Sequence, residues 1–183
     1  MIFLDLVRKR QSVRKYLDKP VEREKIDRCV EAARLAPSAS NSQPWKFIVV
    51  DGKHLKNKVA NATFSKLVSF NAFVPRAPVI VVVTIDKPKL MLQMGNVLKK
   101  TNYGLIDIGI ATEHFCLQAT EEGLGTCILG WFNEKKIKKI LDIPKKNKIG
   151  LVVSLGYSGH ETIREKKRKS VKEISNYNNY KFD

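Results

Sequence analysis

The nine residues APVIVVVTI, positions 77–85, form the longest apolar run of the chain and lie near its middle. The run carries no charge and is apolar at odd and even positions alike, so both faces of a strand formed here would be buried. Nine residues are too few to cross a bilayer, which takes about 20. The run therefore predicts the central strand of a sheet.

Segments on both sides of this run alternate between helical and extended patterns. Apolar residues recur at helical spacing over 26–33 and 105–119, and Gly123 stands where a left-handed residue would end the second helix. Strands are expected at 45–50, 125–132 and 149–155, and shorter helices at 1–10, 54–65 and 134–141, the last capped by Asn133. A hydrophobic centre with mixed elements is typical of α/β and α+β proteins, and periodicity does not choose between them.

Length and composition predict one globular domain over residues 1–183. Hydrophobic content is 43% and charged content 28%, both ordinary for such a domain. Three scattered cysteines, Cys29, Cys116 and Cys127, form no C-x-x-C pair and are expected to be packing residues, so neither a redox dithiol nor a metal site is predicted. The first ten residues resemble a helix more than a signal peptide, and a cytoplasmic location is expected.

The charge of the chain calls for an explanation, since 34 basic and 18 acidic residues give +16. Such an excess suits an anionic partner, whether nucleic acid, anionic lipid or a phosphorylated small molecule. Lysines without interleaved aromatic residues are a weak nucleic-acid signal, so a solvated basic surface is favoured and neither a nucleic-acid nor a membrane partner is expected. The polar, basic tail from about 157 to 183 should lie on the surface or on a partner subunit; within it Ser170 and Glu173 form a capping-box pattern.

Two segments carry residues suited to ligand binding. In the first, Arg10-Gln11-Ser12-Val13-Arg14, an extended backbone would put two guanidinium groups and a hydroxyl on one side, as a phosphate requires. In the second, positions 36–45, two prolines bracket hydroxyl and amide side chains in a stiff loop that a flat ligand could approach, although a plain turn before a buried Trp45 is the alternative. No G-x-G-x-x-G or complete P-loop motif is present.

Together these segments resemble the FMN-dependent nitroreductase family. The family's patterns R-x-S-x-R-x-[YF] and A-P-S-x-x-N-x-Q-P-W-x-F are matched by Arg10, Ser12, Arg14 and Tyr16, then by Ala36-Pro37-Ser38, Asn41, Gln43-Pro44-Trp45 and Phe47. Further matches follow in order along the chain: Ala77-Pro78, Asp107-x-Gly109, Gly123-Leu124-Gly125, Gly130-x-Phe132, Leu141-x-Ile143-Pro144, Gly156-Tyr157 and Lys166-x-Arg168-Lys169. The resemblance thus covers nearly the whole chain.

The resemblance implies an α+β fold, with a mixed central β-sheet wrapped by helices, and an intertwined homodimer with FMN at its interface. It places around the phosphate and ribityl chain Arg10, Ser12, Lys166 and Arg168. It places towards the pyrimidine edge Arg14 and Asn71, and on the cofactor from the other subunit Pro37, Ser38, Ser40 and Asn41. The backbone of Leu129 and Gly130 would face flavin N5.

The implied activity is hydride transfer from NAD(P)H to a nitroaromatic, quinone or similar small acceptor by a ping-pong mechanism. The flavin supplies this chemistry, so no catalytic side chain and no metal ligand is predicted. An FMN-binding module without turnover is the alternative, and a nucleic-acid-binding protein ranks third. The brief segment 86–103 leaves three arrangements open: an open site, a lid from the partner, or a narrower acceptor range.

Overall fold

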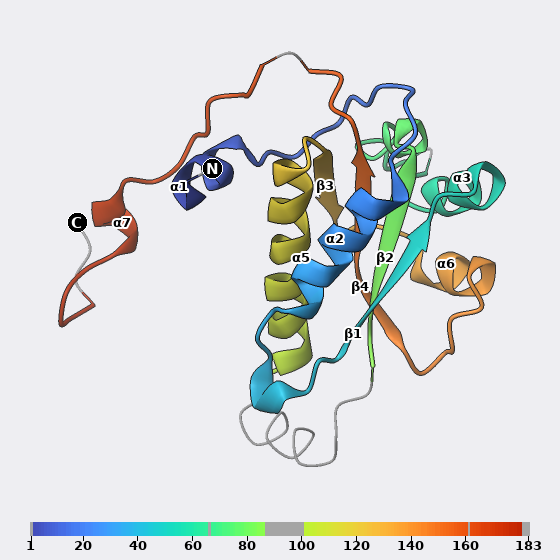
Figure 1. The fold of residues 1–183 in the computed structure, drawn as a ribbon. Helices are drawn as coiled ribbons and strands as arrows, with labels where there is room; N and C mark the ends of the chain where they lie inside the picture. Colours follow the sequence, from blue (N-terminus) through green and yellow to red (C-terminus); the bar gives the residue numbers. More distant parts are fainter. Residues whose placement is uncertain (1, 66, 87–100, 161, 181–183) are drawn as a thin grey trace.

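Four strands form one sheet at the centre of the computed structural model, which describes residues 2–65, 67–86, 101–160 and 162–180 (Figure 1). They are β1 (Trp45–Val50), β2 (Val79–Ile85), β3 (Gly125–Leu129) and β4 (Lys148–Gly156). Their order is β1-β2-β4-β3, and every neighbouring pair is antiparallel. All seven residues of β2 are buried between β1 and β4, which confirms the predicted central strand.

The antiparallel sheet with helices packed against it confirms the α+β class. The sheet was expected to mix parallel and antiparallel strands. Among the described residues, the one parallel pairing is an isolated bridge between Ser12 and Thr126. A second bridge joins Tyr16 and Ser158 in antiparallel sense. The first bridge attaches the segment after the first helix to β3, and the second attaches it to the chain just after β4.

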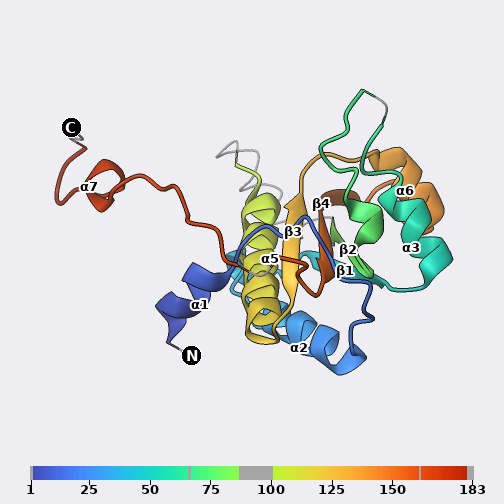
Figure 2. The same cartoon turned by 90° about the horizontal axis from the view of Figure 1, so that it is seen from above.

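Helices cover both faces of the sheet (Figures 1 and 2). On one face lie α2 (Arg23–Arg34) and α5 (Tyr103–Glu121), and on the other α3 (Lys53–Ala60) and α6 (Glu134–Ile140). Side chains of β2 alternate between the two layers because successive strand residues point to opposite faces. Val81 and Val83 join the core under α2 and α5, whereas Ile80 and Val82 join the core under α3 and α6.

Local signals in the sequence reappear at the ends of these elements. Gly123 has φ +74° after α5, and the Asn133 side chain accepts a hydrogen bond from the Lys136 N–H at 3.0 Å. Ser170 and Glu173 form the capping box of α7 (Val171–Ile174). The boundaries of several predicted elements move. α3 begins at Lys53 and ends at Ala60, whose carbonyl accepts from the Thr63 hydroxyl at 2.7 Å; β3 ends at Leu129, before Gly130; and β4 extends from 148 to 156.

The three cysteines are free and buried, which confirms their expected packing role. No helix among the described ranges has the length and apolar character needed to span a membrane. Most of the segment 86–103, at 87–100, lies outside the described residues.

Two apolar surfaces lie at the side of the sheet where α5 is packed. One comprises the start of α1 (Phe3–Lys9) and the outer face of α5, where Ile2, Phe3, Leu4, Leu105 and Ile106 are exposed. The other belongs to the chain end, where α7 stands apart from the sheet and from α5 in both views (Figures 1 and 2). Val171, Ile174 and Tyr177 are exposed there. Large exposed apolar groups of this kind usually mark an interaction surface.

Candidate functional site

A basic cavity of about 350 Å³ lies where the chain leaves α1 and where the tail passes it. We call it the basic cavity. Its lining residues come from two segments 150 or more positions apart: Arg10, Gln11, Ser12, Arg14, Arg164, Glu165, Lys166, Lys167 and Arg168. Six of these nine residues are basic and one is acidic. Cations gathered at this density repel one another, so the cavity is suited to an anion.

The segment after α1 is held in an extended course beside β3. Ser12 bridges to Thr126, and the Val13 N–H donates to the Thr126 carbonyl at 2.8 Å. The Val13 side chain is buried against Gly125, where an added Cβ would lie 2.5 Å from a Val13 methyl group. Because Val13 points inward, Ser12 and Arg14 are directed to the other side, towards the cavity.

The tail is tied to this segment by hydrogen bonds to its backbone. The Arg164 guanidinium donates to the Ser12 carbonyl at 2.7 Å and to the Gln11 Oε1 atom at 3.4 Å. The Lys166 ammonium donates to the Val7 carbonyl at 2.6 Å and also to the Arg8 carbonyl. These carbonyls end α1, where a cation is favoured by the helix dipole. The tail therefore closes the cavity and brings its own cations to it.

Charges in the cavity are only partly compensated. The Arg10 Nε atom lies 3.4 Å from Glu113 Oε1 on α5, with the Arg10 side chain 21% exposed. Burial lowers the pKa of Lys166, and the neighbouring Arg10 and Arg168 lower it further. Arg14 forms no salt bridge within the described ranges. An anion in the cavity would relieve this repulsion.

The structure brings together five of the residues predicted for the cofactor: Arg10, Ser12, Arg14, Lys166 and Arg168. Four other lining residues were not predicted individually: Gln11, Arg164, Glu165 and Lys167. The signal for Arg164 and Lys167 was the basic run at 164–169, which does not reveal which side chains turn inward.

The second predicted segment forms a separate, tightly held loop around η1 (Ala39–Asn41). Ser40, Asn41 and Gln43 have φ near +50°, a conformation that few non-glycine residues adopt. The loop is closed by a hydrogen bond from the Gln43 N–H to Ser38 Oγ at 3.0 Å, and by one from Gln43 Nε2 to Asn41 Oδ1 at 2.9 Å. Neither Pro37, Ser38, Ser40 nor Asn41 lines the basic cavity of the same chain.

A buried carboxylate that was not predicted to have a role anchors this loop. Asp107, in the first turns of α5, is 3% exposed. It accepts a hydrogen bond from the Ala39 N–H at 3.0 Å and one from the Ser42 hydroxyl at 3.4 Å. These hydrogen bonds hold the loop in its strained conformation, as surrounding contacts usually do for strained backbone at functional sites. In the sequence, the motif Asp107-x-Gly109 was the signal for this carboxylate, but its spacing did not reveal which residues Asp107 would hydrogen-bond.

The remaining predicted residues lie at the end of β3. The Leu129 side chain is buried, and Gly130 is exposed, with nothing within 4 Å of an added Cβ. Asn71 is buried, and its amide donates to the carbonyls of Thr63 at 3.0 Å and Trp131 at 3.1 Å. These bonds use both amide hydrogens, so only the Asn71 Oδ1 atom remains for a ligand.

Exposed aromatic side chains stand beside Gly130. Trp131 is 56% exposed and Phe70 is 62% exposed, and their rings meet edge to face with centroids 6.4 Å apart. The exposed backbone at Gly130 is therefore bordered by an aromatic wall that a flat ligand can contact. Within the described ranges no group of three or more histidine, cysteine or acidic residues is arranged to hold a metal ion.

Comparison with known proteins gives the same family throughout. Residues 7–157 match the nitroreductase family. The chain is 35% identical over 164 residues to an Archaeoglobus fulgidus protein named after NADH dehydrogenase/NAD(P)H nitroreductase activity, covering 86% of each chain. It is 31% identical over 147 residues to the Bacillus subtilis FMN reductase [NAD(P)H], covering 74% of this chain and 57% of that protein.

Among solved structures, the FMN-dependent nitroreductase of Clostridium difficile superposes with a TM-score of 0.80 at 30% identity, covering 97% of this chain and all of the other. A nitroreductase family protein of Clostridium novyi superposes with a TM-score of 0.75 at 32% identity, covering 90% and 89%. The family match covers residues 7–157, and relatives above 30% identity align along most of the chain. These two findings lead to one assignment. This chain belongs to the nitroreductase family.

Proposed function

We propose that this chain is an FMN-dependent oxidoreductase of cytoplasmic location that uses NAD(P)H and works as a homodimer. The observation that carries the proposal is the basic cavity, which joins Arg10, Ser12 and Arg14 to Lys166 and Arg168 in a nitroreductase fold. Relatives named FMN reductase and NADPH nitroreductase support the choice of cofactor and hydride donor.

The donor set of the basic cavity fits the phosphate of FMN. Guanidinium and ammonium groups bind a phosphate dianion through charge-assisted hydrogen bonds. The cavity is lined by six basic residues and one acidic residue, so its excess of positive charge is larger than the two negative charges of the phosphate. Ser12 adds a hydroxyl at the same side of the chain as Arg14. In this assignment Arg10, Lys166 and Arg168 hold the phosphate, and Ser12 contacts the phosphate or ribityl chain.

The chemistry that FMN supplies when bound is hydride transfer from NAD(P)H to a small acceptor, for which we propose nitroaromatics and quinones in a ping-pong sequence. Arg14 is assigned to the pyrimidine edge, where its positive charge would offset negative charge on the reduced ring. Asn71 can add an acceptor there through Oδ1. The backbone at Leu129 and Gly130 is assigned to the N5 edge, and Trp131 borders the face that the acceptor approaches.

A homodimer would complete a site that one chain leaves unfinished. The loop with Pro37, Ser38, Ser40 and Asn41 lines no part of the basic cavity of its own chain, so we assign it to the cofactor of the other subunit. The exposed apolar residues of α1 and α5 form a surface that a second copy would bury, and α7 stands clear of its own body. We propose that the tail from about 157 to 183 packs on the partner.

The visible absorption spectrum of the purified protein tests this function. We expect a yellow protein whose visible flavin absorption is bleached by NADPH without oxygen and recovers when a quinone is added. Light scattering on the same sample should give twice the 20.8 kDa chain mass.

Each part of the proposal has its own contrary result. A colourless protein that does not take up added FMN would refute the cofactor assignment. A yellow protein that neither NADH nor NADPH bleaches would favour an FMN-binding module without turnover. A yellow monomer would refute the shared site.

A further inference from the structure

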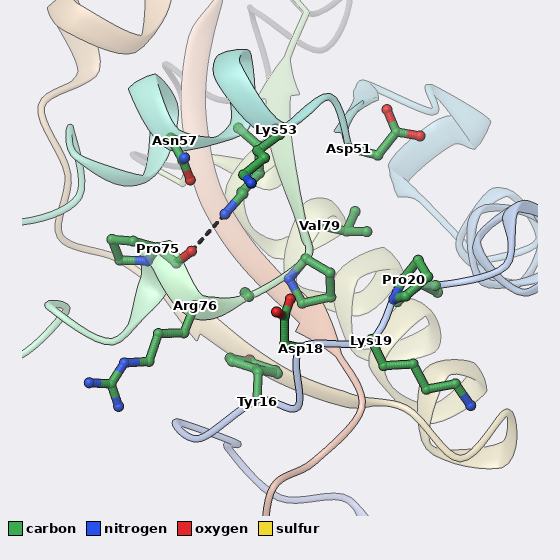
Figure 3. Close-up of a pocket in the computed structure, with 14 residues that line it drawn as sticks. Tyr16, Asp18, Lys19, Pro20, Asp51, Lys53, Asn57, Pro75, Arg76 and Val79 are labelled. Atoms are coloured by element: carbon green, nitrogen blue, oxygen red, sulfur yellow. Dashed lines mark hydrogen bonds between the residues drawn. The ribbon is translucent and has the colours of Figure 1, made fainter.

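A second cavity, unrelated to the basic cavity, lies between the start of α3 and the segment 16–21. Its volume is about 700 Å³, and it shares no lining residue with the basic cavity. We call it the Lys56 cavity. Figure 3 shows Lys53 and Asn57 of α3 on one wall, Pro75 and Arg76 of η2 (Val74–Arg76) at its side, and Tyr16 and Asp18 opposite.

Lys56 is unusual because it is a buried lysine that forms no salt bridge with any residue that the structure describes. Its residue is 7% exposed, and its ammonium donates to the Pro75 carbonyl at 2.6 Å, the bond that is dashed in Figure 3. No carboxylate of the described ranges lies within 4.0 Å of it. Lysine is rarely buried unless paired, and among the described residues the Lys56 ammonium has a single hydrogen-bond acceptor, the Pro75 carbonyl. Burial lowers the pKa of Lys56, Lys53 lowers it further, and Asp18 raises it.

The lining of the cavity has an excess of positive charge. Four of its residues are basic, Lys19, Lys53, Lys56 and Arg76, against the two acidic residues Asp18 and Asp51. Asp51 is already paired outside the cavity with Arg23 at 2.8 Å. Lys19 lies over the Tyr157 ring at 4.0 Å, so it stands at the rim. Lys53 and Arg76 form no salt bridge within the described ranges.

Most of the remaining lining is apolar, and part of it is stiff. Three prolines, Pro20, Pro75 and Pro78, stand with Val21 and Val79 beside the charged groups. Ligand cavities of about 300–1,000 Å³ typically combine such an apolar wall with a few polar groups that fix orientation. The excess of about two positive charges suits a phosphate monoester, whereas Asp18 can accept a hydrogen bond from a hydroxyl group of the same molecule.

We propose that the Lys56 cavity binds a small phosphate monoester that carries a hydroxyl-bearing, flat or apolar body, at a site separate from the flavin. Lys56 and Lys53 hold the phosphate, Asp18 accepts from a hydroxyl group, and the prolines contact the body of the ligand. The site does not depend on the proposed reductase activity.

Calorimetric titration of the FMN-saturated protein with adenosine 5′-monophosphate (AMP) tests the proposal. AMP has the phosphate dianion, ribose hydroxyls and a flat base, and FMN saturation keeps it out of the basic cavity. We expect one AMP bound per chain and no binding of adenosine. The substitution Lys56→Met should weaken AMP binding roughly tenfold or more, as should Lys53→Gln, because each removes a charge-assisted hydrogen bond.

The matched control is Lys136→Met, which removes an exposed lysine of α6 outside the cavity and should leave AMP binding unchanged. The proposal is overturned if the parent protein binds no AMP, if all three variants weaken binding equally, or if FMN abolishes the binding seen without it. Flavin absorbance in the same samples reports FMN occupancy separately, so failure of the flavin assignment remains distinguishable.

Discussion

Arg10→Ala offers the sharpest test of the phosphate site, because Arg10 joins the cavity to α5. The Arg10 side chain is 21% exposed, and its Nε atom lies 3.4 Å from Glu113. A hydrogen bond between charged groups contributes about 1.5–3 kcal/mol, which corresponds to a roughly 10- to 150-fold change in Kd. Five other cations remain in the cavity, and the loss of Arg10 also relieves their mutual repulsion. We therefore expect the lower end, a Kd for FMN raised about tenfold.

Riboflavin provides the internal reference, since it has the isoalloxazine ring and ribityl chain of FMN but no phosphate. Titration followed by flavin fluorescence should show Arg10→Ala weakening FMN while leaving riboflavin nearly unchanged. Arg8→Ala is the matched control, since Arg8 lies in α1 two positions before Arg10, pairs with Asp5 at 3.1 Å, and has a side chain 74% exposed. Equal losses for FMN and riboflavin would refute the assignment of Arg10 to the phosphate.

Three further predictions concern the body of the protein. Phe115→Ala removes a fully buried ring stacked 6.0 Å from Phe47, and urea denaturation should show about 3–5 kcal/mol less stability; a loss below about 1 kcal/mol would contradict this packing. The hydrogen bond from Arg28 lowers the pKa of Glu122 from 4.5 to about 2. The ionised Glu122 side chain therefore stabilises the folded protein fully above pH 4.5, and this stabilisation is lost as the pH falls towards 2. Glu122→Gln should flatten the acid side of the stability curve, and an unchanged slope would count against the pair. Burial raises the pKa of the Cys29 and Cys116 thiols to about 12, so iodoacetamide at pH 8 should label them in urea but not in the native protein; rapid native labelling would disprove their burial.

Much of the local structure could be predicted from the sequence because its signals are short in range. The apolar run at 77–85 predicted β2, and helical spacing predicted α2 and α5 with Gly123 beyond the latter. Backbone conformation at these positions depends on neighbours within one or two turns. The ends of α3 and β3 were placed less well, since the Asn71 amide binds the Thr63 carbonyl after α3 and the Trp131 carbonyl after β3, and the latter contact joins positions 60 residues apart.

The candidate site was predicted in part. Motif resemblance supplied Arg10, Ser12, Arg14, Lys166 and Arg168, and the structure gathers these five around one cavity. Spacing gave no reason to add Gln11 or Arg164, because their hydrogen bonds join positions about 150 residues apart. The anchoring of the Ser38–Gln43 loop by Asp107 was equally hidden, since the carboxylate and its partners are 68 and 65 positions apart.

The sequence by itself determined the order and type of the elements, the buried central strand and the family, since each rests on local pattern or ordered motifs. Only the tertiary structure decided the antiparallel strand order β1-β2-β4-β3, the closure of the basic cavity by the tail, and the burial of Lys56 beside a second cavity. The physical reason is that strand neighbours and cavity walls arise from contacts between distant segments, whose energies depend on three-dimensional packing and not on the spacing of residues along the chain.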